Sequence, residues 1–232
     1  MNVLFINDDD IAPEWGGVKR STHVLTRAFM DRHHLQCYLA FIRGFSGCQT
    51  SAFDDKIQIT DKDGSIRLED FIIRHQIDII VLQKVLPKKY RILPVLEKVA
   101  ERRLCKLIYV LHFSPGHEIL DLAPVNIVNN IKYAESWIYR AVNLCKLATY
   151  PVYRSLKCSR LRHDYKGNYR RFDRIVLLSQ SYVPAYARIA RLPGHHKLVA
   201  IGNPVSFDTS VSREEISRKE REVLIVSRFD EK

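Results

Sequence analysis

The sequence predicts an α/β fold in which a Rossmann-like, mainly parallel β-sheet is covered by helices on both faces. Short apolar runs alternate with longer amphipathic segments along most of the chain. These runs are continuously apolar rather than alternately apolar and polar, as expected for strands buried on both faces. Apolar residues make up 46% of the 232 residues, which is enough to form such a core.

Seven segments have the length and composition of buried strands, and each ends at polar, glycine or proline residues. The predicted strands are 2–6, 36–42, 56–60, 78–82, 106–111, 174–178 and 197–201. Amphipathic or capped segments between them predict helices. The predicted helices are 18–32, 65–75, 93–103, 125–159 with an interruption at Pro151, and 182–191.

The domain organisation is expected to change after residue 205. Residues 1–205 form the predicted Rossmann-like domain, and the polar stretch 206–221 is typical of a linker. Residues 222–226 form a further apolar run, followed by a phosphate-loop-like segment up to residue 232. A lone strand after a linker has nothing of its own to pair with, so we interpret 222–232 as the beginning of a truncated second domain.

The charge and the cysteines limit the function classes. A net charge of +11 favours anionic partners such as nucleic acid, nucleotide phosphates or an acidic membrane surface, without choosing among them. The five cysteines are widely spaced and form no CxxC pair, which disfavours a zinc site or a disulfide framework. Without signal-peptide features or a long apolar run, we expect a cytoplasmic location, with peripheral contact at the inner face of the membrane.

Four motifs follow predicted strands and could carry chemistry. Gly16 and Gly17, after Pro-Glu-Trp, would allow close approach of a ligand to a helix N-terminus, or they make only a tight turn. His112 would project at the carboxyl edge of the sheet, unless it is a satisfied structural histidine. Asn203 lies in Gly-Asn-Pro-Val, again directly after a predicted strand. The alternative is an ordinary turn, in which Asn-Pro is common.

The fourth motif contains Arg228 and Lys232, which follow the last predicted strand. Arginine offers a planar fork for phosphate oxygens and lysine offers a mobile positive charge, so the pair could grip a diphosphate. The alternative is two solvated surface charges, which is the commoner fate of these residue types.

Taken in order, these segments resemble the family 4 retaining glycosyltransferases, whose GT-B fold joins two Rossmann-like halves. The resemblance spans residues 1–32, 110–115, 175–181, 201–205 and 224–232, which reach only the midpoint of that family. It implies transfer of a sugar from a nucleotide-sugar donor to a glycan or lipid-linked acceptor, in polysaccharide or glycolipid biosynthesis. It implies no metal and no other cofactor.

The resemblance also implies roles for individual residues. Gly16, Gly17, Arg228 and Lys232 would bind the donor phosphates, and His112 would act catalytically near the transferred sugar or the acceptor. The acceptor side of the cleft would contain Asp10, Trp15, Ser114, Ser179 and Asn203. Ser227 stands where the family usually has glycine, and the family's Glu-x7-Glu region lies beyond residue 232. The donor sugar is therefore not predicted, and the fragment alone is expected to be inactive.

The triplet Asp8-Asp9-Asp10 offers a rival interpretation. Asp-x-Asp motifs bind a divalent metal in GT-A glycosyltransferases, and carboxylate oxygens suit magnesium or manganese. The triplet follows the first strand, whereas the GT-A motif usually follows a mid-domain strand. We therefore expect a polar loop that borders the acceptor cleft.

The segment 154–174 carries eight Lys or Arg, two Asp and the aromatic residues Tyr165, Tyr169 and Phe172. Such residues could stack on nucleic-acid bases, lie at an anionic membrane, or form a solvated helix face with tyrosines packed inward. Of the functional alternatives, membrane contact is favoured, because many enzymes of the resembling family glycosylate lipid-linked acceptors.

Two other function classes compete with a transferase. One is a non-enzymatic α/β module that binds an acceptor glycan or a partner. The other is a nucleic-acid-binding protein, which ranks last because the sequence has no helix-turn-helix, zinc-finger or RNP pattern. No nucleic-acid partner is therefore expected.

Overall fold

The computed structural model describes residues 1–11, 17–44, 53–59, 64–83, 92–102 and 105–204. In these residues, seven strands form one sheet in the order β3-β2-β1-β4-β5-β6-β7, and every neighbouring pair is parallel. The strands are β1 Asn2–Asp9, β2 Gln36–Arg43, β3 Asp55–Gln58, β4 Ile79–Leu82, β5 Lys106–Leu111, β6 Arg174–Leu177 and β7 Leu198–Ala200. The predicted parallel sheet is confirmed.

Helices lie between β1 and β2 and in every connection from β3 to β7, as expected for parallel crossovers. They are α1 Gly17–His33, α2 Gly64–Arg74, α3 Ile92–Glu101, α4 His117–Leu120, α5 Pro124–Lys132, α6 Trp137–Ala148, α7 Tyr150–Arg171 and α8 Tyr182–Ala190. Among the described residues, no helix is long and apolar enough to cross a membrane.

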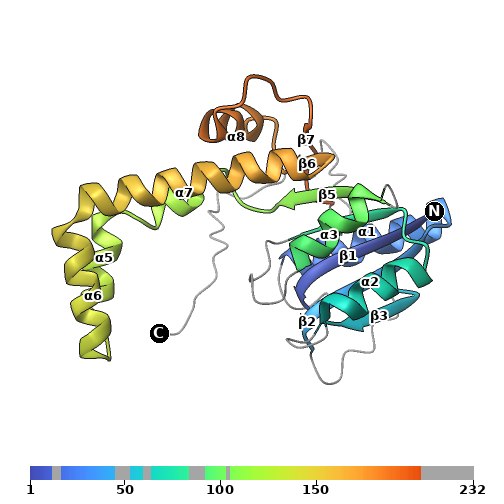
Figure 1. Cartoon of the computed structure of the whole chain (residues 1–232), viewed down its shortest axis with the longest axis horizontal. Helices are drawn as coiled ribbons and strands as arrows, with labels where there is room; N and C mark the ends of the chain where they lie inside the picture. Colours follow the sequence, from blue (N-terminus) through green and yellow to red (C-terminus); the bar gives the residue numbers. More distant parts are fainter. Residues whose placement is uncertain (12–16, 45–52, 60–63, 84–91, 103–104, 205–232) are drawn as a thin grey trace, which may run out of the picture.

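The core lies on both faces of the sheet, as predicted. Successive residues of a strand point to opposite faces, so Val3 and Phe5 of β1 pack on the α1 side with Phe29. Leu4 and Ile6 belong to a larger cluster with residues of α2, α3, α7 and α8. Figure 1 shows α2 and α3 on one side of β1 and α1 on the other.

Strand β1 is three residues longer than predicted, because backbone pairing with β2 continues past the apolar run. Asp8 and Asp9 therefore belong to the strand, and the expectation that they form a polar loop is wrong. Asp9 is paired in register with Arg43, and the Asp10 amide donates to the Arg43 carbonyl at 2.9 Å. Arg43 Nε also lies 2.9 Å from an Asp9 carboxylate oxygen. This cross-strand ion pair allows two acidic residues to remain in a strand.

The predicted helical region 125–159 is divided differently from the prediction. It forms α5, α6 and α7, and α7 continues to Arg171. The predicted interruption at Pro151 is confirmed to within two residues, because α6 ends at Ala148, Thr149 lies between the two helices, and Pro151 stands in the first turn of α7. Proline is tolerated there because its missing N–H would have no partner inside the helix.

Two of the three aromatic residues in the segment 154–174 pack inward. Tyr165 and Phe172 are 5% and 1% exposed, and Tyr169 packs partly buried against the same core. Stacking of Tyr165 and Phe172 on a nucleic-acid base or on lipid is therefore wrong, because this half of α7 covers the sheet. The alternative of a solvated helix face with its aromatic residues packed inward describes these residues correctly.

A Phe5→Ala substitution tests the packing between β1 and α1. Phe5 is fully buried, and its ring centroid lies 6.4 Å from that of Phe29 and 6.2 Å from that of Phe53. We expect the free energy of unfolding to fall by about 3–5 kcal/mol in urea denaturation. The control Ile66→Ala, at a 64% exposed position of α2, should change it by less than about 0.5 kcal/mol. Equal losses in both variants would contradict this description of the core.

Candidate functional site at the carboxyl edge of the sheet

The strand order reverses direction between β1 and β4. The chain builds β2 and β3 on one side of β1 and then crosses to add β4 to β7 on the other side. In open parallel sheets, ligands bind in the crevice beyond the carboxyl ends of the strands at such a switch point. Asp10 follows β1 and Gln83 follows β4, so these residues mark the corresponding point here.

A buried polar pair fixes α1 to the switch point. Thr22 Oγ1 lies 2.8 Å from Gln83 Oε1 and 2.8 Å from the Val18 carbonyl oxygen. Thr22 is fully buried, and Gln83 and Asn7 are 6% and 5% exposed. Sequence reasoning missed all three residues. The available signal was a polar residue directly after each of two buried strands, and threonines four residues apart in α1.

Helix α1 begins at a glycine with open space beside its Cα among the described residues. Gly17 is exposed, and a Cβ atom added there would meet nothing within 4 Å. This first turn contains no acidic residue, so no carboxylate of its own balances the positive end of the helix dipole. Gly17 therefore stands at a helix N-terminus that an anion could approach. Trp15 and Gly16 lie outside the described residues.

The Asp8-Asp9-Asp10 triplet is held by basic side chains. Asp8 and Asp9 pair with Arg43, and Asp9 lies 3.3 Å from Lys19 Nζ. Asp10 Oδ1 lies 3.1 Å from Lys56 Nζ and accepts the Ile11 amide at 2.8 Å. The three carboxylates therefore tie β1 to β2, β3 and α1. No group of three His, Cys, Asp or Glu side chains in the described ranges could hold a metal ion.

His112 follows β5 and differs from a satisfied structural histidine. Both ring nitrogens are buried, and neither has a hydrogen-bond partner among the described residues. Desolvation by burial holds the pKa of the His112 imidazole below its usual value, so the ring is neutral at pH 7. A neutral ring with two unpaired nitrogens can donate one hydrogen bond and accept another from a ligand.

The loop after His112 is anchored by α7 and α8. The Gly116 amide donates to the Tyr165 hydroxyl at 3.1 Å, and that hydroxyl donates to the Glu118 carboxylate at 3.2 Å. Gly116 has a φ of 84°, and a Cβ atom there would lie 2.9 Å from Ile189 Cδ1. Glycine is therefore required at this position. Ser114 is exposed in the same loop, and its carbonyl accepts the His117 amide at 3.0 Å.

Ser179 follows β6 and stands at the start of α8. Its Oγ lies 2.9 Å from Ser181 Oγ and accepts the Ser181 amide at 3.3 Å. The hydroxyl is therefore engaged in local helix-start bonding. Asn203 follows β7 and is exposed.

The sheet aligns polar residues along its carboxyl edge. Neighbouring parallel strands lie about 4.8 Å apart, so a row from β1 to β7 extends over about 19 Å. In the order of the strands β1, β4, β5, β6 and β7, the row consists of Asp10, Gln83, His112, Ser179 and Asn203. The structure thus brings the described candidate residues to one edge, whereas Arg228 and Lys232 lie outside the described residues.

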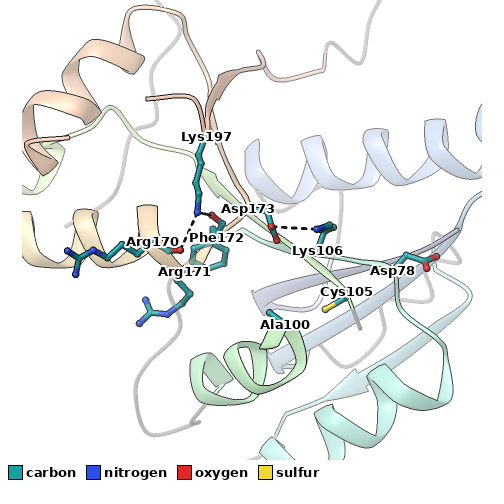
Figure 2. A pocket seen from close by; sticks show the side chains of 9 residues that line it. All are labelled: Asp78, Ala100, Cys105, Lys106, Arg170, Arg171, Phe172, Asp173 and Lys197. Carbon is teal, nitrogen blue, oxygen red and sulfur yellow. Dashed lines mark hydrogen bonds and ion pairs between the residues drawn. The ribbon is translucent and has the colours of Figure 1, made fainter. Parts of the chain in front are cut away.

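A separate cavity of about 560 Å³ lies at the opposite, amino edge, where β4, β5 and β6 begin (Figure 2). Lys197 Nζ donates to the carbonyls of Phe172 at 2.9 Å and Arg170 at 3.3 Å, at the C-terminus of α7. Asp173 lies 3.9 Å from Lys106 Nζ and accepts the Leu107 amide at 2.9 Å. These groups cap a helix and join two strands, which is a structural role.

No family model matches the chain, and no curated protein matches it. Two solved structures of Anabaena Alr3699/HepE are similar to it. One, in complex with UDP and glucose, is 15% identical with a TM-score of 0.47. The other, in complex with UDP, is 18% identical with a TM-score of 0.49. Each comparison covers 94% of this chain and 48% of the other, so this chain spans about half the length of those structures.

The lowered pKa of His112 makes a prediction about pH. Its folded-state pKa lies below the unfolded value, so the unfolded chain binds more protons as the pH falls. The contribution of the neutral ring to the free energy of unfolding should be fully present above the ordinary histidine pKa of about 6.5. It should decrease as the pH falls below that value. We expect His112→Gln to reduce this loss in urea titrations between about pH 7 and pH 5. An imidazole NMR titration of His112 at or above 6.5 would contradict the assignment.

Proposed function

We propose that this chain is the acceptor-side half of a GT-B glycosyltransferase that transfers a sugar from a nucleotide-sugar donor to a glycan or lipid-linked acceptor. The observation that carries the proposal is the neutral His112, whose ring nitrogens have no hydrogen-bond partner among the described residues, in a row of polar residues at the carboxyl edge. The open N-terminus of α1 lies at the same edge, as its Lys19–Asp9 contact requires. The ordered motifs of the sequence support the same assignment.

The chemistry requires stabilisation of a departing nucleoside diphosphate. In this proposal, the first-turn amides of α1 at Gly17, and Gly16 before it, face the donor phosphates. Arg228 and Lys232 add positive charge from the beginning of the second half. Preorganised cations and amides of this kind stabilise developing negative charge without a metal.

His112 contacts the transferred sugar or the acceptor in this proposal. Since its ring is neutral, it can bind a hydroxyl group by donating from one nitrogen and accepting at the other. The loop held by Gly116 and Tyr165 fixes the backbone beside it. The other described acceptor-side candidates are Asp10, Ser114, Ser179 and Asn203. Retaining stereochemistry, family 4 membership and a role in polysaccharide or glycolipid synthesis belong to the same proposal.

A His112→Ala variant of the protein containing both halves tests the central residue. We expect turnover with a nucleotide sugar to fall by about 10²–10⁴-fold, because a polar contact to the reacting sugar or acceptor is lost. His117→Ala is the matched control, since His117 is an exposed histidine in the same loop region. Arg228→Ala and Lys232→Ala should each reduce turnover by about 10²–10³-fold. Unchanged kinetics in all three site variants would refute the assignment of these residues, whereas no sugar transfer by the parent protein would leave a non-catalytic binding module.

A chelator distinguishes this site from a metal-dependent GT-A site. The three carboxylates of the Asp8–Asp10 triplet are paired with Arg43, Lys19 and Lys56. Initial rates of the complete enzyme should therefore be the same with and without EDTA. Loss of activity in EDTA, restored by magnesium or manganese, would overturn the metal-independent mechanism.

A further inference from the structure

A helical arm projects away from the sheet. It consists of α5, α6 and residues 150–160 of α7, and Figure 1 shows α5 and α6 at the far end of α7. Helices α5 and α6 pack against each other, burying Ile127, Ala134 and Asn143 between them. The Asn143 amide donates to the Tyr139 carbonyl at 2.8 Å and accepts from Lys146 at 3.0 Å. The arm therefore has a specific interior of its own.

The outer surface of the arm is apolar to an unusual degree. Trp137 is 76% exposed, Leu156 is 67% exposed and Tyr133 is 64% exposed. Ten large apolar side chains of the arm are exposed: Val125, Val128, Tyr133, Trp137, Ile138, Tyr139, Val142, Leu144, Val152 and Leu156. Exposed apolar surface that is gathered on one element marks an interaction site rather than ordinary surface.

The arm is also positively charged. Residues 124–160 contain one acidic residue, Glu135, and six basic residues. The basic residues are Lys132, Arg140, Lys146, Arg154, Lys157 and Arg160. None of the six forms an ion pair with a carboxylate in the part of the chain that the structure describes.

Lysines of the arm lie beside its tyrosine rings. Lys132 Nζ is 5.3 Å from the centroid of Tyr133, and Lys146 Nζ is 5.9 Å from that of Tyr139. Side chains that combine an apolar stem or ring with a polar tip suit the boundary between hydrocarbon and headgroups. A Trp-, Tyr- and Lys-rich surface is typical of that boundary.

We propose that the arm docks on the surface of an anionic lipid bilayer, with its exposed apolar side chains among the acyl chains and its basic side chains at the headgroups. Charge complementarity favours this occupant, because each basic residue near an anionic surface adds to the attraction. A second copy of the chain would bring two basic arms together, which like charges oppose. A nucleic acid would meet the charges but leave the apolar side chains in water. The proposal holds whether or not the chain belongs to a glycosyltransferase.

Vesicle flotation of the complete chain tests the proposal. We expect it to float with phosphatidylcholine vesicles that contain phosphatidylglycerol, and not with phosphatidylcholine alone. A Trp137→Ser, Ile138→Ser, Leu144→Ser variant should lose at least about tenfold in vesicle affinity. The apolar control is Ile66→Ser with Ile73→Ser, both exposed on α2, which should float like the parent chain.

A charge-matched pair of variants separates specific docking from net charge. Lys132→Glu, Arg154→Glu, Lys157→Glu changes the arm, whereas Arg27→Glu, Arg67→Glu, Arg188→Glu changes exposed positions elsewhere by the same amount. Only the arm variant should lose vesicle binding by at least about tenfold. Equal loss in both variants would overturn the proposal. Circular dichroism melting curves that match the parent chain verify folding.

Tryptophan emission reports how deeply the arm enters the bilayer. The chain has two tryptophans, so a Trp15→Phe chain retains only Trp137 as a reporter. Its emission should shift to the blue on anionic vesicles and be quenched by brominated acyl chains. If the chain binds the vesicles but the emission of Trp137 does not shift, the apolar side chains of the arm do not insert among the acyl chains. The parent chain could instead fail to float and show self-association or RNA binding that the serine variant abolishes. That result would overturn the bilayer proposal in favour of the other partner.

Discussion

Parallel pairing of all seven strands is the constraint from which the remaining structure follows. A parallel ladder needs a crossover after each strand, and each crossover begins at the same edge of the sheet. Polar residues that follow the strands in sequence are therefore gathered into one row in space. Asp10, His112 and Asn203 are far apart in the chain, yet each stands just beyond the carboxyl end of a strand. No direct contact among them is needed to produce this arrangement.

The strand and helix pattern could be predicted because burial on both faces leaves a local signal. Continuous apolar runs such as those of β1 and β5 are visible in the sequence, and their parallel pairing follows from the intervening helices. The end of β1 could not be predicted in this way. Acidic residues are rare in strands, and Asp9 is retained by Arg43, a partner that only the folded sheet brings alongside.

The candidate site was predictable only in part. The position of His112 after a strand is a sequence feature, but the burial of its two ring nitrogens without a partner in the described part of the chain is a property of packing. The Thr22–Gln83 pair joins residues 61 positions apart, and neither residue type identifies its partner. The predicted apolar side of α1 also omitted Thr22 and Thr26, which are its fully buried residues. Tertiary hydrogen bonding makes these polar side chains compatible with the interior.

Helix α7 connects the helical arm to the part of the sheet edge that carries His112. At 22 residues it is about 33 Å long, with the arm at its N-terminus and Tyr165 near its C-terminus. Tyr165 bonds to Gly116, four residues after His112, and its carbonyl accepts the Tyr186 hydroxyl at 2.9 Å. The arm and the anchor of the loop that follows His112 are therefore parts of one continuous helix.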